Sequence, residues 1–262
     1  MEIILNNASI FFETIGEGEP VFLIHGFPLY REMWRPQIEF LTKEGFKVVA
    51  IDLRGFGDST ANTTEWSMDD FGDDIINVAN FLEIEKFSIA GMSMGGYITF
   101  NILDRFPERI NKVILVATKA QADDEAGKAK RNELIEVAKT KGPQAVIDHF
   151  KQILFAPLTW EKRPNLILTA HSIMKRSSLN GIIGALKAMR DRKDYVSLLP
   201  RIYHPTLIMH GLSDLASPIP NAKLMKEKIP NSILFESEIA GHMINLEDTK
   251  RFNEEILSFL RS

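Results

Sequence analysis

The sequence predicts an α/β fold with a mostly parallel central sheet, covered by helices on both faces. The first observation is a set of short, almost wholly apolar runs at residues 21–24, 46–51, 112–117 and 205–210. Runs of this length without polar alternation are typical of strands that are buried on both faces. The second observation is that helical patterns separate most of these runs, and this alternation is typical of parallel sheets.

The other elements follow in a regular order. Residues 2–15 alternate between apolar and polar side chains, which predicts a hairpin-forming pair of strands. Two further strands are predicted at residues 86–90 and 232–235. Apolar residues at helical spacing predict helices at residues 32–42, 68–82, 97–106, 178–192, 219–228 and 247–260.

The alternation stops between residues 119 and 176. This stretch predicts helices at 122–140, 143–153 and 161–175, with no apolar strand between them. We interpret it as a helical insertion over one edge of the sheet. The alternative is three ordinary surface helices. The predicted helix at 178–192 then returns the chain to the core.

Composition narrows the classes of function. The chain has 262 residues, a formal net charge of −4 and no cysteine. Without a basic block, nucleic acid and anionic membrane surfaces are not expected as partners. The lack of cysteine excludes disulfides, thiolate metal sites and a cysteine nucleophile. No signal peptide or membrane-spanning run is visible, so a cytoplasmic location is expected.

One short stretch stands out as a candidate catalytic turn. Residues 91–96 read Gly-Met-Ser-Met-Gly-Gly, between a predicted strand and a predicted helix. In this context the G-x-S-x-G pattern indicates a tight turn that exposes the serine, called a nucleophile elbow. A side chain at Gly91 or Gly95 would crowd such a turn. The alternative is a chance match, because serine and glycine are common in ordinary loops.

Polar residues stand directly after several predicted strands. They are His25, Asp52, Ser93 and Asp214, and a further histidine, His242, lies in the last loop. In open parallel sheets, ligand sites form outside the carboxyl ends of the strands. A serine nucleophile needs a base to take its proton, and that base needs a carboxylate to orient it. The strand ends therefore supply all three kinds of group.

Five motifs together carry a resemblance to a known family. They are His25-Gly26-Phe27-Pro28, Asp52-Leu53-Arg54-Gly55-Phe56-Gly57-Asp58-Ser59, Gly91-Met92-Ser93-Met94-Gly95-Gly96, His210-Gly211-Leu212-Ser213-Asp214 and Gly241-His242. In this order the chain resembles the α/β-hydrolase superfamily, in its branch of small esterases, non-haem perhydrolases and enol-lactonases. Ser93, Asp214 and His242 also follow the chain order of that superfamily's triad.

The resemblance implies a role for each of these residues. Ser93 would be the nucleophile, His242 the general base and Asp214 the acid that orients it. The backbone N–H groups of Phe27 and Met94 would form the oxyanion hole. Residues 119–176 would be a cap, or lid, inserted after the sixth strand, and residues 1–118 and 177–262 the core domain.

The implied activity is that of a serine esterase acting on small to medium carboxylic esters, without a metal or organic cofactor. Enol-lactone hydrolysis, carbon–carbon bond hydrolysis and perhydrolysis use the same triad and stay open. A ligand-sensing receptor of the same fold is a further alternative. Apolar residues of the insertion predict a substrate with an apolar group of modest size; they are Phe150, Ile153, Leu154, Phe155, Leu158 and Trp160.

Other candidate residues are given structural or pocket-lining roles. We expect His25 to hold the loop that shapes the oxyanion hole. Asp52 and Arg54 are expected in a buried ion pair or a hydrogen-bonded turn. Three residues are expected to line the substrate pocket, namely Phe27, Trp34 and Met94. The oligomeric state is not predicted.

Overall fold

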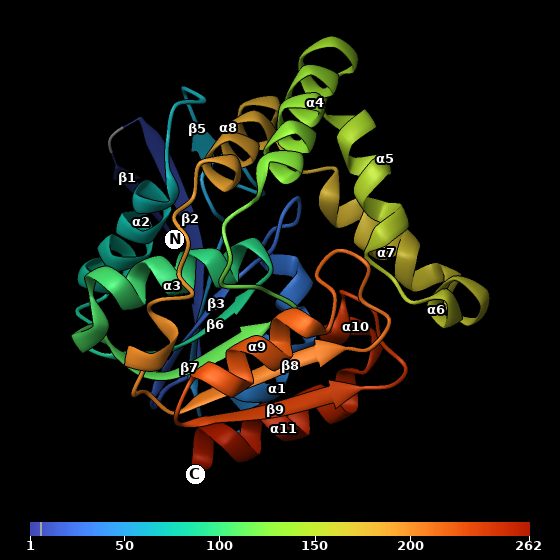
Figure 1. The fold of residues 1–262 in the computed structure, drawn as a ribbon. Coiled ribbons are helices and arrows are strands. Elements are labelled where there is room, and N and C mark those ends of the chain that lie inside the picture. The colour runs from blue at the N-terminus through green and yellow to red at the C-terminus, as the bar shows by residue number, and fades with distance from the viewer. Residues whose placement is uncertain (6) are drawn as a thin grey trace.

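The computed structural model describes residues 1–5 and 7–262, so Asn6, one residue of the predicted hairpin, lies outside the described residues. The strands of the described chain are β1 (Glu2–Leu5), β2 (Ala8–Ile15), β3 (Pro20–Ile24), β4 (Lys47–Ile51), β5 (Thr60–Ala61), β6 (Phe87–Met92), β7 (Ile110–Val116), β8 (Thr206–Gly211) and β9 (Ser232–Ser237). They form one nine-stranded sheet in the order β1-β2-β4-β3-β6-β7-β8-β9, with β5 paired to β2 (Figure 1).

The sheet is mostly parallel, as predicted. Strands β3, β4, β6, β7, β8 and β9 run parallel to their neighbours in this group, whereas β1, β2 and β5 pair antiparallel. The register aligns the ends of the central strands, because Ile24 pairs with Gly91 and Met92 pairs with Val116. Segments that follow β3, β6 and β7 therefore leave the sheet at the same edge.

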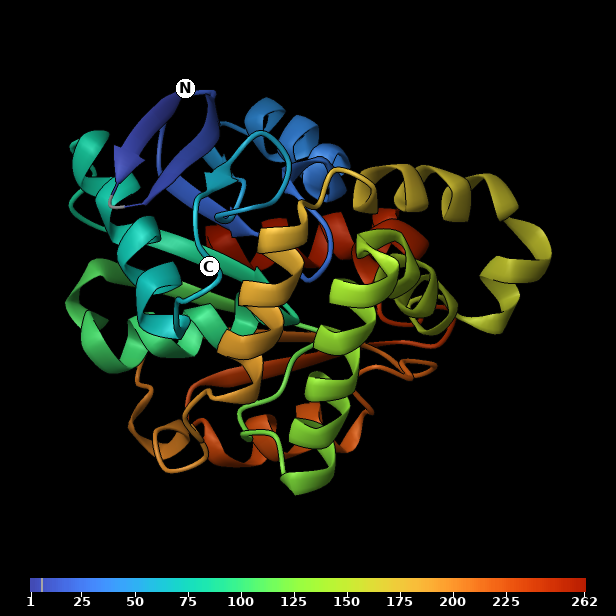
Figure 2. The ribbon, with the colours of Figure 1, turned by 90° about the horizontal axis from the view of Figure 1, so that it is seen from above.

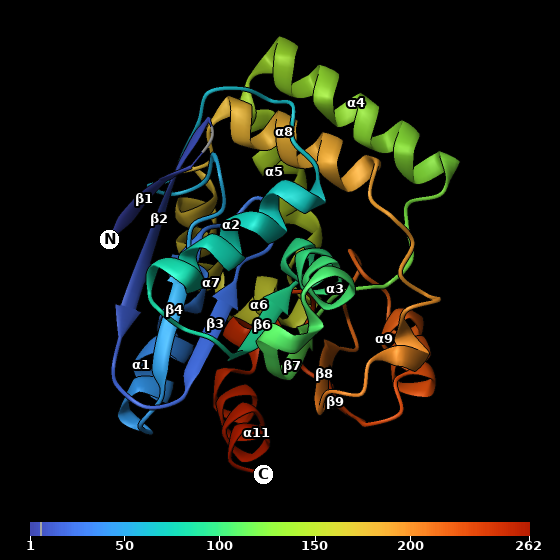
Figure 3. The ribbon, with the colours of Figure 1, turned by 90° about the vertical axis from the view of Figure 1, so that its left-hand side faces the viewer.

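Helices cover both faces of the sheet. Those outside the insertion are α1 (Arg35–Lys43), α2 (Met68–Phe81), α3 (Met94–Arg105), α8 (Leu179–Arg190), α9 (Pro220–Lys228), α10 (Ile244–Glu247) and α11 (Thr249–Arg261). Helices α1 and α11 lie on one face, and α2, α3 and α9 lie on the other (Figure 3). None of the helices in the described residues is long and apolar enough to cross a membrane.

The regular secondary structure of the insertion, residues 119–176, is entirely helical. It contains α4 (Glu125–Lys141), α5 (Pro143–Ile153), α6 (Pro157–Lys162) and α7 (Pro164–Met174), all between β7 and β8. These helices gather on one side of the molecule (Figures 1 and 2). The division into core and cap domains stays a prediction.

The helix predicted at 161–175 is confirmed as α7, but it begins three residues later than predicted, and α6 before it was not predicted. Helix α6 ends at Lys162 and α7 begins at Pro164. Proline has no backbone N–H to donate and disfavours a helical conformation in the residue before it. Arg163 accordingly leaves the helical region, with φ −135° and ψ 51°.

Helix α8 packs on the insertion and on the core. It lies alongside α4 (Figure 3). On the core side, Ser178 N donates to Gly55 O over 2.9 Å. A Cβ atom on Gly181 would lie only 2.2 Å from Gly55 O. Two glycines therefore allow the backbone of α8 to touch the loop after β4.

We expect Gly181→Ala to lower the free energy of unfolding by about 1–3 kcal/mol, because the added methyl group must push α8 away from Gly55. Urea unfolding measures the change. Leu179→Ala, at an exposed position two residues earlier in the same helix, is the control and should change stability by less than about 0.5 kcal/mol. Equal stability of Gly181→Ala and the unmodified chain would contradict this account of the contact.

Candidate active site

Ser93 occupies a strained turn between β6 and α3. Its φ of 52° and ψ of −112° lie outside the regions that residues with a Cβ atom prefer. Hydrogen bonds hold this conformation: Ser93 N donates to Val116 O over 2.9 Å, and Thr118 Oγ1 donates to Ser93 O over 2.8 Å. The serine is thereby fixed at the edge of the sheet where the parallel strands end.

Glycines leave the space that this turn needs. A Cβ atom on Gly91 would lie 2.3 Å from Gly95 O, and one on Gly95 would lie 2.4 Å from Ile24 O. Distances below about 3 Å are severe clashes, so the prediction that both positions require glycine is confirmed. Gly26 also approaches the serine closely, since a Cβ atom there would lie 3.2 Å from Ser93 Cβ.

Asp214 and His242 form a buried pair. His242 Nδ1 lies 2.8 Å from Asp214 Oδ2. The other oxygen of Asp214 accepts from Ala216 N over 2.9 Å and from Ser217 N over 2.8 Å. These two backbone donors hold the carboxylate in place, and the carboxylate in turn orients the imidazole ring and leaves its Nε2 atom for other partners.

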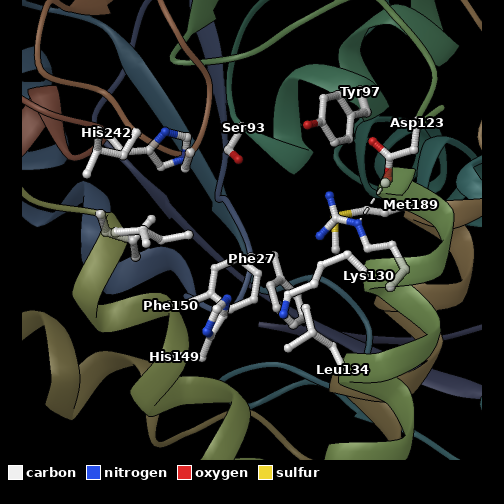
Figure 4. A pocket seen from close by; sticks show the side chains of 16 residues that line it. Phe27, Ser93, Tyr97, Asp123, Lys130, Leu134, His149, Phe150, Met189 and His242 are labelled. Carbon is white, nitrogen blue, oxygen red and sulfur yellow. Dashed lines mark hydrogen bonds and ion pairs between the residues drawn. The ribbon is translucent and has the colours of Figure 1, made fainter. Parts of the chain in front are cut away.

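Ser93 and His242 both line one cavity of about 210 Å³. Their side chains lie on the same side of this cavity in Figure 4. Its apolar wall comes from the core and from the insertion, and consists of Phe27, Leu134, Phe150, Ile153, Leu154, Met189, Leu215 and Ala216. Its polar wall contains Tyr97, Asp123, Lys130, Arg131 and His149.

Two backbone N–H groups flank Ser93. Met94 is the first residue of α3, and Phe27 follows Gly26, which packs against the serine. Among the hydrogen bonds of the described residues, neither Phe27 N nor Met94 N has an acceptor. Unpaired N–H groups beside a helix N-terminus favour negative charge.

His25 holds the loop that carries Phe27. Its Nδ1 atom lies 2.9 Å from Gly26 O, and its Nε2 atom accepts from Leu53 N over 2.9 Å. The ring is fully buried, and burial lowers the pKa of His25 from 6.5 to about 4. Neutral imidazole matches these bonds, because one ring nitrogen donates and the other accepts.

Glu247 connects the loop of His242 to the insertion. One carboxylate oxygen accepts from Gly241 N over 2.8 Å, and the other accepts from Ala156 N over 2.8 Å and from Thr159 Oγ1 over 2.6 Å. Burial raises the pKa of Glu247, and its effect is larger than that of the three hydrogen bonds, which lower the pKa. The sequence analysis did not identify this residue, because its three donors come from segments distant in the chain.

Two of the predicted pocket residues lie elsewhere. Phe27 lines the cavity, but Trp34 and Met94 do not. The Trp34 side chain is fully buried and packs against Phe252, with ring centroids 6.2 Å apart, and Met94 is also fully buried. The predicted lining is therefore corrected at both positions.

The predicted apolar residues of the insertion divide into two groups. Phe150, Ile153 and Leu154 line the cavity, and the Phe27 and Phe150 rings pack edge to face with centroids 4.9 Å apart. Phe155 is buried outside the lining, whereas Leu158 and Trp160 are about 40% exposed (41% and 42%).

Asp52 and Arg54 have structural partners, in line with the expectation, although each has a different one. Asp52 forms a buried ion pair with Arg31 and accepts from Asp58 N over 2.8 Å. Arg54 forms a buried ion pair with Asp74 over 2.7 Å. Neither residue lines the cavity.

The remaining histidines have other surroundings. His171 lies 3.0 Å from Asp148, and His204 lies 3.0 Å from Pro107 O. His210 is buried beside Asp214, at 3.3 Å. His149 lines the cavity on the insertion side, a position that the sequence analysis did not identify.

A family comparison identifies the class of protein. Residues 19–249 match the family model described as alpha/beta hydrolase fold. The chain belongs to the α/β-hydrolase family, in its branch of small esterases.

Individual relatives agree with this class. The chain is 31% identical to the AB hydrolase superfamily protein YisY of Bacillus subtilis, covering 98% of this chain and 97% of that protein. It is similar in structure to a thermophilic esterase from Thermogutta terrifontis, with a TM-score of 0.94, 32% identity and coverage of 97% and 93%. An esterase from Exiguobacterium antarcticum gives a TM-score of 0.89, 31% identity and coverage of 97% and 96%. The chain is thus a hydrolase.

We expect acid to destabilise the protein partly through His25. Its pKa is about 4 in the folded protein and 6.5 in the ordinary, unfolded environment. As pH falls from 6.5 to 4, only the unfolded chain gains a proton at this residue, so stability is full above this window and is lost through it. The loss attributable to His25 is about 3 kcal/mol.

Urea unfolding of the unmodified chain and His25→Asn between pH 7 and pH 4 measures this contribution. The asparagine variant should be less stable at pH 7, and its stability should depend less steeply on pH. Identical pH slopes for the two proteins would contradict the assignment.

We expect Glu247→Gln to lower the free energy of unfolding by about 1–3 kcal/mol, because the new amide NH₂ group must face a backbone N–H donor. Urea unfolding at pH 7 measures it. Glu136→Gln, which removes the same charge from an exposed ion pair with Lys139, is the matched control and should have little effect. If both variants lower the free energy of unfolding by the same small amount, an amide can replace the buried carboxylate of Glu247.

Proposed function

We propose that the protein is a carboxylic ester hydrolase that works through an acyl-enzyme, with Ser93, His242 and Asp214 as its catalytic triad. One observation carries the proposal: Ser93 and His242 line the same cavity, while Asp214 is bonded to the far side of the His242 ring. Family membership and the esterase relatives support the same reaction.

In the proposed first step, Ser93 Oγ attacks the ester carbonyl carbon and His242 Nε2 takes the hydroxyl proton. Asp214 favours this step because its carboxylate fixes the tautomer with Nδ1 protonated and stabilises the imidazolium that forms. The strained backbone of Ser93 supports the attack by presenting the hydroxyl at the edge of the sheet.

The carbonyl oxygen becomes negatively charged as the serine adds. The N–H groups of Phe27 and Met94 are the proposed donors to this oxygen, and each donor of this kind is worth about 3–4 kcal/mol in related chemistry. His242 then gives its proton to the departing alcohol, and the acyl group stays on Ser93. Water, activated by His242, releases the acid and regenerates the serine.

We further propose that residues 119–176 act as a cap that selects the substrate. Support comes from Leu134, Phe150, Ile153 and Leu154, which are insertion residues in the cavity wall. The small volume of the cavity favours esters with short acyl chains over long ones.

We expect Ser93→Ala and His242→Ala to lower kcat/KM for 4-nitrophenyl esters by about 10⁴-fold or more, and Asp214→Asn by about 10⁴-fold. Mass spectrometry after fluorophosphonate treatment should find one adduct, on Ser93, that forms much more slowly in His242→Ala. Ser172→Ala, an exposed serine on α7, is the control. Full activity of Ser93→Ala, or an adduct on another residue, would contradict the proposal.

A further inference from the structure

The cavity has a cationic wall that the proposed triad does not use. Lys130 and Arg131 of α4 line it together with Asp123. In Figure 4, Lys130 lies across the cavity from His242 and Ser93. Gly127, Leu134 and these two cations share one face of α4, because their spacing brings them together on consecutive turns.

Cations outnumber the carboxylate of Asp123, although two of them, Lys119 and Arg192, lie behind the cavity lining. Asp123 lies 2.8 Å from Arg192 Nη2, 3.0 Å from Arg131 Nε and 3.2 Å from Lys119 Nζ. Burial would raise the pKa of Asp123, but its ion pairs with Arg192 and Arg131 outweigh burial and hold the pKa well below its usual range. A single negative charge therefore faces three positive ones, and an excess of positive charge remains.

Arg131 keeps part of its guanidinium group free. Its Nε atom is bonded to Asp123, and among the described residues neither Nη atom has a hydrogen-bond partner. The side chain is only 16% exposed, so bulk water reaches little of it. Two parallel N–H donors of a guanidinium match the two oxygens of a carboxylate.

The other titratable groups do not neutralise this wall. Lys130 Nζ pairs with Glu133 at the surface over 3.0 Å. Burial, together with the charge of Lys130, lowers the pKa of His149. At neutral pH, His149 is therefore an uncharged neighbour, and Glu133 offsets the charge of Lys130, so this pair leaves the excess around Asp123 unchanged.

We propose, on the basis of the proposed ester hydrolysis, that the preferred substrates carry a carboxylate, which the free Nη atoms of Arg131 bind while the ester group lies at Ser93. Apolar side chains of Phe27, Phe150 and Leu134 line the same cavity and suit a short aliphatic chain between the two groups. The substrate class is thus a half-ester of a short dicarboxylic acid. Hydrolysis of the half-ester consumes one water and releases a dicarboxylate and an alcohol.

A matched pair of esters tests the inference. Mono-(4-nitrophenyl) glutarate and 4-nitrophenyl pentanoate have the same chain length, and the terminal carboxylate of the first replaces a methyl group of the second. After subtraction of the uncatalysed rates, we expect kcat/KM to favour the glutarate ester by about 30-fold or more, since charge-paired contacts in a desolvated site discriminate to at least this degree.

Variants assign that preference to Arg131. Arg131→Gln should remove most of it, mainly by raising KM for the glutarate ester, and should change the rate for the pentanoate ester by only a few fold. Arg131→Lys keeps the charge but loses the paired donors, so it should restore part of the preference. Lys139→Gln removes one positive charge from the same helix at a position outside the cavity, and should leave the preference unchanged.

Free glutarate gives a readout that needs no variant. It should inhibit hydrolysis of the pentanoate ester by the unmodified enzyme at lower concentration than pentanamide does. If Arg131→Gln fails to fold, this comparison of the two inhibitors tests whether the cavity binds a carboxylate.

The outcomes separate this inference from the proposed function. If the pentanoate ester is hydrolysed in a Ser93-dependent reaction without any preference for the glutarate ester, the carboxylate site is wrong and the esterase proposal stands. An equal loss of both rates in a folded Arg131→Gln variant also overturns the site. If neither ester is hydrolysed, the proposed function itself fails.

Discussion

Close backbone packing around Ser93 is the constraint on which the rest of the site depends. The segments after β3 and β6 meet the first turn of α3 so tightly that Gly91 and Gly95 leave no room for a side chain and Gly26 leaves little. This packing holds the serine at a φ of 52°, which costs about 1–3 kcal/mol and persists only where the surroundings impose it. The same packing sets the backbone N–H groups of Phe27 and Met94 beside the hydroxyl. The same packing therefore positions both the proposed nucleophile and the proposed oxyanion donors.

Buried carboxylates organise the rest of the site in a similar way. Asp214 accepts two backbone N–H groups at one oxygen and the His242 ring at the other. Glu247 accepts one donor from the loop of His242 and two from the insertion. Charged groups at low exposure are stable only when they are well hydrogen-bonded, and both residues meet this condition. Each carboxylate ties together loops that belong to different parts of the sequence.

The sequence was sufficient for the features that depend on local pattern. Apolar runs located the central strands, and the glycines around Ser93 indicated the tight turn. Two kinds of feature could not be read in this way. Pro164 begins α7 and separates it from α6, so the start predicted at residue 161 is three residues too early. Trp34 was expected to line the pocket, but the direction of its side chain depends on packing against Phe252. The cationic face of α4 has visible helical spacing, yet the rotation of that helix toward the cavity is set by tertiary packing.

The contacts around Gly241 connect the segment before α6 to the loop that carries His242. Gly241 packs against Ala156, Met243 N donates to Leu154 O over 3.1 Å, and Glu247 bonds both segments. A movement that lifts α6 from the core must therefore break these contacts or carry the histidine loop with it. The start of α6 and the loop that carries the imidazole are, by this construction, held together as one unit.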